Sequence, residues 1–373
     1  MAKMSTQASV RLGFDVAILE KDAHSPAGDL TRNEFVGWVD DDKTLQGFAN
    51  RCDIITLENE FVDHQRLEYL ENLGKKVIPS STTIALIQDK LLQKETLTQS
   101  GIPVPRFVAV EESHSFNEIA SIVGKPFILK SRKMGYDGYG NALVKNEKEY
   151  NDGVRRLSNR HSSLMAESFI DFSVELAVMV ARTRREVKVY PVVQTIQKNH
   201  ICHTVIAPAH PLRHASEASI SKKLKKDAEE IAVESVKAVK GFGLYGIEMF
   251  LAKDEEIIVN EMAPRPHNSG HYTIEACITS QFENHIRSIM ELPLGSTEMM
   301  RRHAVMINLL GKPNPQKQVD VYRTALKVPN IHLHIYGKLH SRIGRKMGHL
   351  TILGDDANKI LKQAVELEKK IRL

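Results

Sequence analysis

The first 80 residues alternate between helical and strand-like patterns of apolar positions. Ala2–Leu12 follows a helical pattern, and two short apolar runs, Phe14–Leu19 and Asp53–Leu57, predict buried strands. A further helix is predicted over Asp63–Asn72. Because such alternation is typical of a parallel sheet, we expect a Rossmann-like α/β domain over residues 1–79.

The order of these elements departs from the usual start of such a sheet. A parallel nucleotide-binding sheet normally begins with a strand and a glycine-rich turn ahead of its first helix. Here the helix predicted from Ala2 follows the first residue directly. We therefore expect the domain to lack that first strand and its turn.

The next region has a long helical stretch and a strand that leads into a glycine-rich loop. Ser80–Thr83 supplies helix-starting hydroxyls, and the amphipathic pattern continues to Gly101. Two prolines in Ile102–Pro105 then enforce an extended joint. Gly124–Lys130 predicts a strand, and the three glycines of Gly135–Gly140 indicate a mobile loop after it.

The remaining pattern predicts a helix, a hairpin and a strand-rich end. Ser219–Lys240 is helical with a lysine-rich face, and Gly246–Met262 predicts a β-hairpin. Beyond residue 300, long helices are absent until Ala357–Ile371. The expected fold class is α/β (α+β), with domains at residues 1–79, 80–300 (including a smaller lobe at about 105–170) and 301–373.

Composition restricts the class of protein. Hydrophobic residues make up 42% and charged residues 26% of the 373 positions, as in ordinary globular chains. Cys52, Cys202 and Cys277 lie far apart, which favours reduced thiols and excludes a clustered thiolate zinc site. The net charge of +5 is dispersed, so we expect no nucleic-acid partner. The chain has no apolar run of membrane-spanning length and no signal-peptide pattern, so we expect no membrane association and a cytoplasmic location.

The predicted hairpin brings two glutamates together. If its turn centres on Asp254–Glu255, Glu248 lies directly opposite Glu261. Opposed carboxylates repel each other unless a cation neutralises them, and oxygen ligands of this kind suit Mg²⁺. The ordinary alternative is that both glutamates are solvated on an outer face.

Three further groups of polar residues could bind an anion. Two prolines flank Arg265 in the loop after the hairpin, which makes this loop rigid and favours a ligand site. The loop Gly135–Gly140 could present backbone amides to a phosphate, although it lacks the spacing of a P-loop. Lys338, Arg345 and Lys346 surround two tight turns, where either an anionic ligand or solvent accounts for the charge. Adjacent residues such as Arg345 and Lys346 need a turn to converge on one anion.

Four segments closely resemble one family: Gly135–Gly138, Asn260–His271, Tyr336–Lys338 and Arg345–His349. They are similar to the N5-carboxyaminoimidazole ribonucleotide synthetases, and the resemblance covers nearly the whole chain. It implies an ATP-grasp fold with a truncated N-terminal Rossmann-like domain and a small strand-rich C-terminal domain. It also implies ATP and Mg²⁺ as cofactors, aminoimidazole ribonucleotide and bicarbonate as substrates, and a homodimer. The implied ligase reaction carboxylates the ribonucleotide amine through carboxyphosphate in purine biosynthesis.

The resemblance also implies roles for individual residues. It assigns the nucleotide to Lys90, Lys130, Gly135, Tyr136, Asp137, Gly138, Tyr139, Gly140, Asn141, Glu167, Ser168, Phe169, Ile170, Glu175, Gln197, Asn260 and Glu261. It assigns the ribonucleotide to Glu60, Tyr136, Asp137, His267, Asn268, Lys338, Arg345 and Lys346. It assigns the metal to Glu248 and Glu261, and catalytic roles to Asp137, Lys338 and Arg345. A regular hairpin points Asn260 to the opposite face from Glu261, so its participation requires a bulge.

The chain departs from the family pattern at three places. Tyr139 stands where the family usually has a basic residue, and Gln197 stands where a histidine is frequent. Third, the first strand and the glycine-rich turn of the family pattern are missing from the start of this sequence. Two alternatives therefore remain beside the synthetase: another ATP-grasp ligase, and a catalytically weakened homologue that binds nucleotide.

Overall fold

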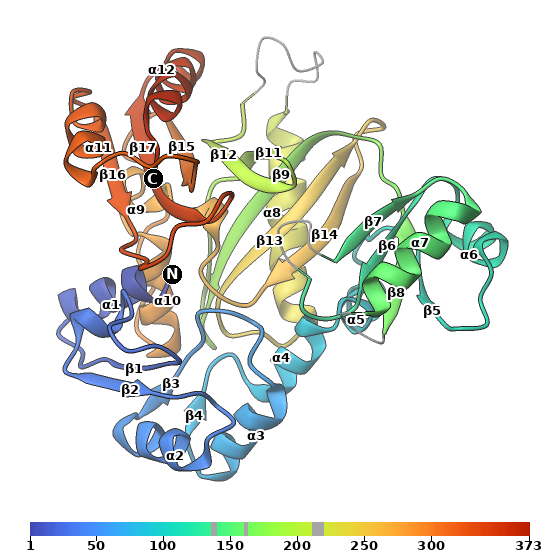
Figure 1. Ribbon diagram of the computed structural model, residues 1–373, viewed down its shortest axis with the longest axis horizontal. Coiled ribbons are helices and arrows are strands. Elements are labelled where there is room, and N and C mark those ends of the chain that lie inside the picture. Colours follow the sequence, from blue (N-terminus) through green and yellow to red (C-terminus); the bar gives the residue numbers. More distant parts are fainter. Residues whose placement is uncertain (136–139, 160–162, 211–219) are drawn as a thin grey trace.

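The N-terminal region combines short parallel strands with helices. In this computed structural model, which describes residues 1–135, 140–159, 163–210 and 220–373, it lies at the lower left of Figure 1. Its elements are α1 (Ala2–Arg11), β1 (Ala17–Glu20), η1 (Gly28–Leu30), β2 (Asn33–Val36), α2 (Asp42–Arg51), β3 (Ile54–Ile55), α3 (His64–Asn72) and β4 (Lys76–Val77). Strands β1 and β2 form one parallel pair and β3 and β4 another, so the expected parallel alternation is confirmed. These two pairs are separate sheets within the described residues.

The helical stretch predicted from Ser80 to Gly101 is interrupted, which corrects the expectation of one long helix. It forms α4 (Ser81–Gln88) and α5 (Lys90–Gln99) instead. Asp89 between them has an extended backbone, and its carboxylate accepts from the backbone amides of Leu91 and Leu92. Asp89 is therefore the N-cap of α5, and it is held by a bidentate bond from Arg132.

A small lobe with its own core follows. Its elements are β5 (Phe107–Val110), α6 (Phe116–Val123), β6 (Phe127–Ser131), β7 (Asn141–Val144), α7 (Glu147–Ser158) and β8 (Leu164–Ser168). The four strands form an antiparallel sheet in the order β5-β8-β6-β7, and the two helices cover one face of it (Figure 1). Phe116, Phe127 and Tyr150 contact one another in the core between the sheet and the helices.

A nine-stranded sheet runs through the rest of the molecule. Its strands are β9 (Phe172–Arg182), β10 (Val187–Val189), β11 (Val193–Lys198), β12 (Ile201–Ala207), β13 (Gly243–Ala252), β14 (Ile257–Ala263), β15 (His303–Leu310), β16 (Ile331–Ile335) and β17 (Lys346–Gly354). Their order is β14-β13-β9-β11-β12-β15-β17-β16, with β10 beside β9. The sheet therefore continues across the domain boundary predicted at residue 300, so the C-terminal strands extend the sheet of the preceding region.

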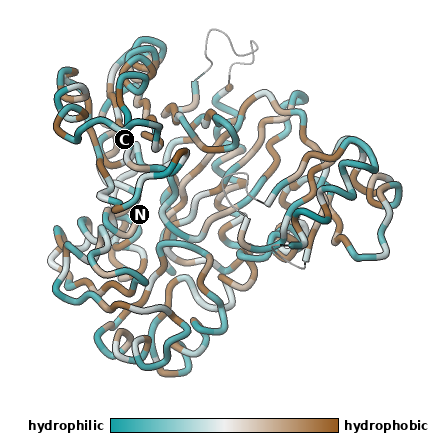
Figure 2. Tube along the Cα trace, viewed as in Figure 1, coloured by the Kyte–Doolittle hydropathy of each residue, from teal (hydrophilic) through white to brown (hydrophobic). Residues whose placement is uncertain are grey.

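Helices cover both faces of this sheet. They are α8 (Lys222–Ala238), α9 (Thr273–Ala276), α10 (Gln281–Ile289), α11 (Gln318–Ala325) and α12 (Ala357–Lys370). Along β9, Val178 and Val180 pack in the core under α8, whereas Ala177 and Met179 pack on the opposite side with Tyr272. Apolar positions accordingly follow the central strands (Figure 2). No helix in the described part of the chain is both long and apolar enough to cross a membrane.

His285 provides a test of how α10 packs against the N-terminal region. Its ring is buried, and its Nε2 lies 3.2 Å from the Thr56 hydroxyl. Burial lowers the pKa of His285 to about 4. A histidine in the unfolded chain has a pKa of about 6.5, so as the pH falls the unfolded state takes up a proton before the folded state does. Between about pH 6.5 and pH 4, His285 therefore lowers the free energy of unfolding by up to roughly 3 kcal/mol.

Glutamine does not titrate, so His285→Gln should lose less stability than the wild type when the pH falls from about 6.5 to 4. The measurement is the urea midpoint of unfolding across this pH series. His332→Gln, at an exposed histidine of β16, is the matched control and should leave the pH dependence unchanged. Equal pH dependence in wild type and His285→Gln would contradict the prediction.

Candidate active site

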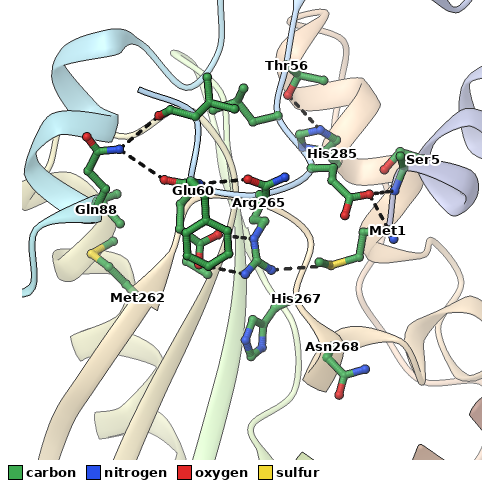
Figure 3. Close-up of a pocket in the computed structure, with 18 of the residues that line it drawn as sticks. Met1, Ser5, Thr56, Glu60, Gln88, Met262, Arg265, His267, Asn268 and His285 are labelled. Atoms are coloured by element: carbon green, nitrogen blue, oxygen red, sulfur yellow. Dashed lines mark hydrogen bonds and ion pairs between the residues drawn. The ribbon is translucent and has the colours of Figure 1, made fainter. Parts of the chain in front are cut away.

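A cavity of about 1890 Å³ lies where the N-terminal region, the small lobe, the central sheet and the C-terminal strands meet, and Figure 3 shows part of its lining. Its wall contains the following residues that the sequence predicted for ligand binding: Glu60, Lys90, Lys130, Gly135, Asn141, Glu167, Ser168, Phe169, Ile170, Glu175, Gln197, Glu248, Asn260, Glu261, His267, Asn268, Lys338, Arg345 and Lys346. Gly140 is described but is not part of the wall. Tyr136, Asp137, Gly138 and Tyr139 lie outside the described residues.

The hairpin of β13 and β14 has the predicted Glu248–Glu261 pair and the required bulge, but the pairs nearer the turn are shifted by one residue from the predicted register. Glu248 lies directly opposite Glu261, and the next paired residues are Met249 and Val259. Asn260 is therefore an extra residue between two consecutive pairs, and the local distortion places it in the cavity wall beside Glu261. Its Oδ1 accepts a hydrogen bond from Lys130 Nζ at 3.3 Å. The bulge thus brings three oxygen-bearing side chains to one place.

The carboxyl groups of Glu248 and Glu261 have very different pKa values because their surroundings differ. Burial, reinforced by the nearby Glu261 and Glu175 carboxylates, raises the pKa of Glu248 to about 8. Burial also disfavours the charged form of Glu261, but Lys90 and Lys130 outweigh this effect and lower its pKa to about 2. Glu261 therefore holds a negative charge more readily than Glu248. A divalent cation fits these oxygen donors because it would allow both carboxylates to ionise.

Helix α5 supplies two lysines to this region. Lys90 donates to the Glu261 carboxylate. Lys94, four residues later on the same helical face, lies 3.0 Å from Glu167 and donates to the Asn260 carbonyl at 3.0 Å. Sequence reasoning missed Lys94, although its spacing from Lys90 was a signal. Burial lowers the pKa of Lys94, as does the charge of Lys130, but the Glu167 carboxylate supports its charged form.

Glu167 connects the small lobe to this set of charges. Its carboxylate lies 2.5 Å from Lys130 Nζ and 3.0 Å from Lys94 Nζ, and all three side chains are buried. Its side chain is therefore committed to the two lysines. Glu175, in the same wall, is hydrogen-bonded to Gln197, and burial raises the pKa of its carboxyl group.

A buried amide holds α5 against the bulged strand. The Gln93 side chain accepts from the Met262 backbone amide at 3.1 Å and donates to the Met262 carbonyl at 3.3 Å. A polar side chain without partners would be costly here, but both ends of this amide are satisfied. Gln93 therefore fixes the position of Lys90 and Lys94 relative to the hairpin.

The loop that follows the hairpin carries a second polar group (Figure 3). Arg265 forms a bidentate ion pair with Glu60, which joins the loop to the N-terminal region. His267 Nε2 lies 3.4 Å from Glu248, and its Nδ1 lies 2.7 Å from the Ser269 hydroxyl. Burial and the nearby Arg265 and Lys346 lower the pKa of His267 to about 3. His267 is therefore a neutral hydrogen-bonding group.

Asn268 is held by a partner that sequence reasoning missed. Asn308, a completely buried residue of β15, exchanges two side-chain hydrogen bonds with Asn268, at 2.9 and 2.6 Å. The Asn308 amide also donates to the Cys202 carbonyl at 2.8 Å. Asn308 is not part of the cavity wall, so it acts by positioning Asn268.

The three basic residues predicted near the C-terminus meet at the cavity. Lys338 donates to the Lys346 carbonyl at 2.9 Å, and Arg345 donates to the His340 carbonyl at 2.7 Å. Gly344 has a φ of +81° in the turn before β17, which begins at Lys346. This turn lets the adjacent Arg345 and Lys346 reach the same cavity, as the sequence predicted.

Known protein families match this chain in three consecutive segments. Residues 1–88 match the ribonucleotide synthetase preATP-grasp domain, and residues 95–282 match the ATP-grasp domain. Residues 304–363 match the phosphoribosylaminoimidazole carboxylase C-terminal domain. These matches confirm the expected ATP-grasp fold with an N-terminal domain before it and a C-terminal sheet domain after it.

Individual relatives agree with these matches. The chain is 40% identical over 362 residues to phosphoribosylaminoimidazole carboxylase of Ogataea methanolica, covering 95% of this chain but only 64% of that longer protein. It is 39% identical over 354 residues to N5-carboxyaminoimidazole ribonucleotide synthase of Synechococcus elongatus, covering 94% of this chain and 87% of that protein.

Solved structures extend the comparison to three dimensions. The Aspergillus clavatus N5-carboxyaminoimidazole synthase, solved in complex with ADP and 5-aminoimidazole ribonucleotide, is similar with a TM-score of 0.88 at 34% identity, over 99% of this chain and 96% of that chain. The Thermotoga maritima synthetase is similar with a TM-score of 0.85 at 39% identity, over 100% and 96% of the two chains. By sequence and by structure, the chain belongs to the N5-carboxyaminoimidazole ribonucleotide synthetase family of ATP-grasp proteins.

Proposed function

We propose that this protein is a ligase that uses ATP and bicarbonate to carboxylate 5-aminoimidazole ribonucleotide, giving N5-carboxyaminoimidazole ribonucleotide for purine biosynthesis. One observation carries this proposal. Apart from Gly140, the described residues predicted to bind the nucleotide and those predicted to bind the ribonucleotide line the same cavity, although they come from four regions of the chain. A ligand site shared by both substrates is what a transfer between them requires.

The reaction has two steps that balance without a further reactant. A bicarbonate oxygen attacks the γ-phosphorus of ATP, which releases ADP and gives carboxyphosphate. The exocyclic amine of the ribonucleotide then attacks the carboxyl carbon. The bond from that carbon to the phosphate oxygen breaks, and phosphate and a proton are released. Neither step requires a covalent bond to the protein, so positioning and charge stabilisation are the main contributions of the chain.

The buried lysines are arranged for the first step. Lys90 and Lys130 face the cavity from α5 and β6 and offer their ammonium groups to the nucleotide phosphates. Glu248, Asn260 and Glu261 are the residues that would hold Mg²⁺, which neutralises phosphate charge when it is bound. Lys94 stays behind this layer and keeps Glu167 and the bulge in position.

The loop and the C-terminal strands are arranged for the second step. Lys338, Arg345 and Lys346 provide positive charge that suits the phosphate of a ribonucleotide. His267 lies 3.4 Å from Glu248 and is near Lys346, whose charge contributes to lowering its pKa, so this loop connects the glutamate pair with the basic groups. We further infer a homodimer, Mg²⁺ dependence and a cytoplasmic location, all three implied by the resemblance or by composition.

Phosphate release tests the proposed function. Purified protein should release phosphate from ATP with bicarbonate, and the rate should rise on addition of 5-aminoimidazole ribonucleotide, with the carboxylated ribonucleotide as product. Stimulation by a different amine only would indicate another ATP-grasp ligase. Nucleotide binding without turnover under these conditions would indicate a homologue that has lost catalysis.

The Glu248 and Glu261 pair gives a prediction about catalytic turnover. Glu261→Ala removes one proposed metal ligand and leaves Lys90 without its carboxylate partner, so ribonucleotide-dependent phosphate release should fall by about 100-fold or more. Glu256→Ala, at an exposed glutamate in the turn of the same hairpin, should keep normal turnover. Near wild-type turnover in a folded Glu261→Ala protein would show that Glu261 does not hold the metal.

A Lys338 variant should affect the ribonucleotide but not ATP. Lys338→Ala should lower kcat/KM for the ribonucleotide by about 30-fold, which corresponds to about 2 kcal/mol for a charge-assisted contact. The affinity for an ATP analogue, measured by calorimetry, should stay unchanged. Lys327→Ala replaces an exposed lysine of the same region and serves as the control. If ATP binding weakened while the ribonucleotide dependence did not, Lys338 would belong to the nucleotide site.

Asn308 is expected to act only through Asn268. Asn308→Ala should raise KM for the ribonucleotide by about five- to tenfold, the effect of one lost hydrogen bond, without changing KM for ATP. Asn268→Ala should have a similar or larger effect, and the double variant should be no worse than Asn268→Ala alone. Additive losses in this cycle would show that Asn308 contributes independently of Asn268.

A further inference from the structure

A second cluster of possible metal ligands lies outside the cavity wall. Glu275 of α9, His334 of β16 and His349 of β17 place one carboxylate oxygen and two ring nitrogens within 4.8 Å of one another. His334 and His349 are directly paired across the two strands. None of the three is among the residues that line the cavity, so the proposed reaction does not use them.

Two atoms of this cluster lack partners. The Oε2 atom of Glu275 and the Nε2 atom of His349 are buried, and neither has a hydrogen-bond partner among the described residues. His349 is 0% exposed, and the Glu275 side chain is 10% exposed. A buried polar atom without a partner costs stability, and here two such atoms belong to residues whose ligand atoms converge. A bound cation would satisfy both.

We propose that Glu275, His334 and His349 form a binding site for a zinc-like divalent cation. Two imidazole nitrogens and one carboxylate oxygen are a donor set that suits Zn²⁺ rather than Mg²⁺, which prefers oxygen ligands alone. The site is therefore chemically different from the Glu248 and Glu261 pair. It is also independent of the proposed carboxylation.

The surroundings of His349 match those of a metal-binding histidine. The Tyr336 hydroxyl lies 2.9 Å from His349 Nδ1, which leaves Nε2 for a ligand. A hydrogen bond at the second ring nitrogen is the usual way in which proteins orient a ligating imidazole.

His334 is the ligand that has to move. The two imidazole rings are nearly parallel, at 8° with centroids 4.4 Å apart, and lone pairs in parallel ring planes do not converge on one ion. The His334 side chain is 26% exposed, so its ring has room to turn. Its Nε2 currently lies 2.6 Å from Glu275 Oε1, and this contact gives way to two bonds to the cation.

The bound cation would join three segments close to the substrate cavity. Helix α9 follows the loop that carries His267 and Asn268, β16 leads to Tyr336 and Lys338, and β17 begins at Lys346. A cation held by all three segments would fix the loop that carries His267 and Asn268 against the C-terminal strands. The role is structural, because the three ligands lie behind Tyr336, which itself lines the cavity.

Metal titration of the full chain tests the site. Chelator-treated protein is titrated with Zn²⁺ by calorimetry in excess Mg²⁺, and with Co²⁺ by visible absorption. We expect one Zn²⁺ per chain, a Co²⁺ spectrum of low coordination number, and a higher midpoint of thermal unfolding with zinc. Glu275→Gln and His334→Gln should each weaken zinc binding by at least about tenfold and abolish this stabilisation.

Two controls identify the ligands. His332→Gln removes an exposed histidine from the same strand as His334, and Glu248→Gln alters the hairpin pair, so both should bind zinc as the wild type does. The proposal fails if the wild type binds no stoichiometric zinc. It also fails if Glu275→Gln and His334→Gln retain wild-type affinity, or if only Glu248→Gln loses it. Two ligand variants at partly exposed side chains are used so that misfolding of one does not decide the result.

Discussion

The bulge at Asn260 is the constraint on which the rest of the site depends. It adds one residue to β14, and the cavity therefore receives Asn260 and Glu261 together, opposite Glu248. Two carboxylates placed so close together repel each other, and positive charge nearby offsets this repulsion. The lysines of α5 and β6 supply that charge, and this requirement determines how the surrounding elements pack.

The charge network joins elements that are otherwise separate. Glu167 pairs with Lys94 of α5 and Lys130 of β6, so the small lobe is tied to the same helix that contacts the hairpin. The continuous sheet then carries this arrangement from β14 to β17, where the basic residues proposed to bind the ribonucleotide begin. The two halves of the cavity are therefore positioned by one sheet rather than by a flexible connection between domains.

Local chemistry made part of this arrangement predictable. The opposition of Glu248 and Glu261 was predicted from the turn, but the register next to the turn was not, because Met249 pairs with Val259 rather than with Asn260. The need for a bulge followed from placing Asn260 beside Glu261. The break between α4 and α5 was missed because the helical periodicity is uninterrupted there, although Asp89 is a preferred N-cap residue and caps α5 locally. The contact of Asp89 with Arg132, which is distant in sequence, could not be predicted. Lys94 was missed for a similar reason. A lysine on an amphipathic helix indicates solvent exposure until its buried partner, Glu167, is known.

The same network explains why nucleotide and metal are expected to bind together. Lys90 is paired with Glu261, so a phosphate that draws on the same ammonium group weakens the charge balance at this partly exposed carboxylate. A divalent cation bound with the phosphate would compensate, because it would stand beside Glu261 and favour the ionised form of Glu248, whose pKa is raised by burial and by the neighbouring carboxylates. Either ligand alone would leave part of this charge uncompensated, whereas the two together would balance it. The free energy of charge pairing therefore couples the two ligands, and it does so through the residues that the bulge brings together.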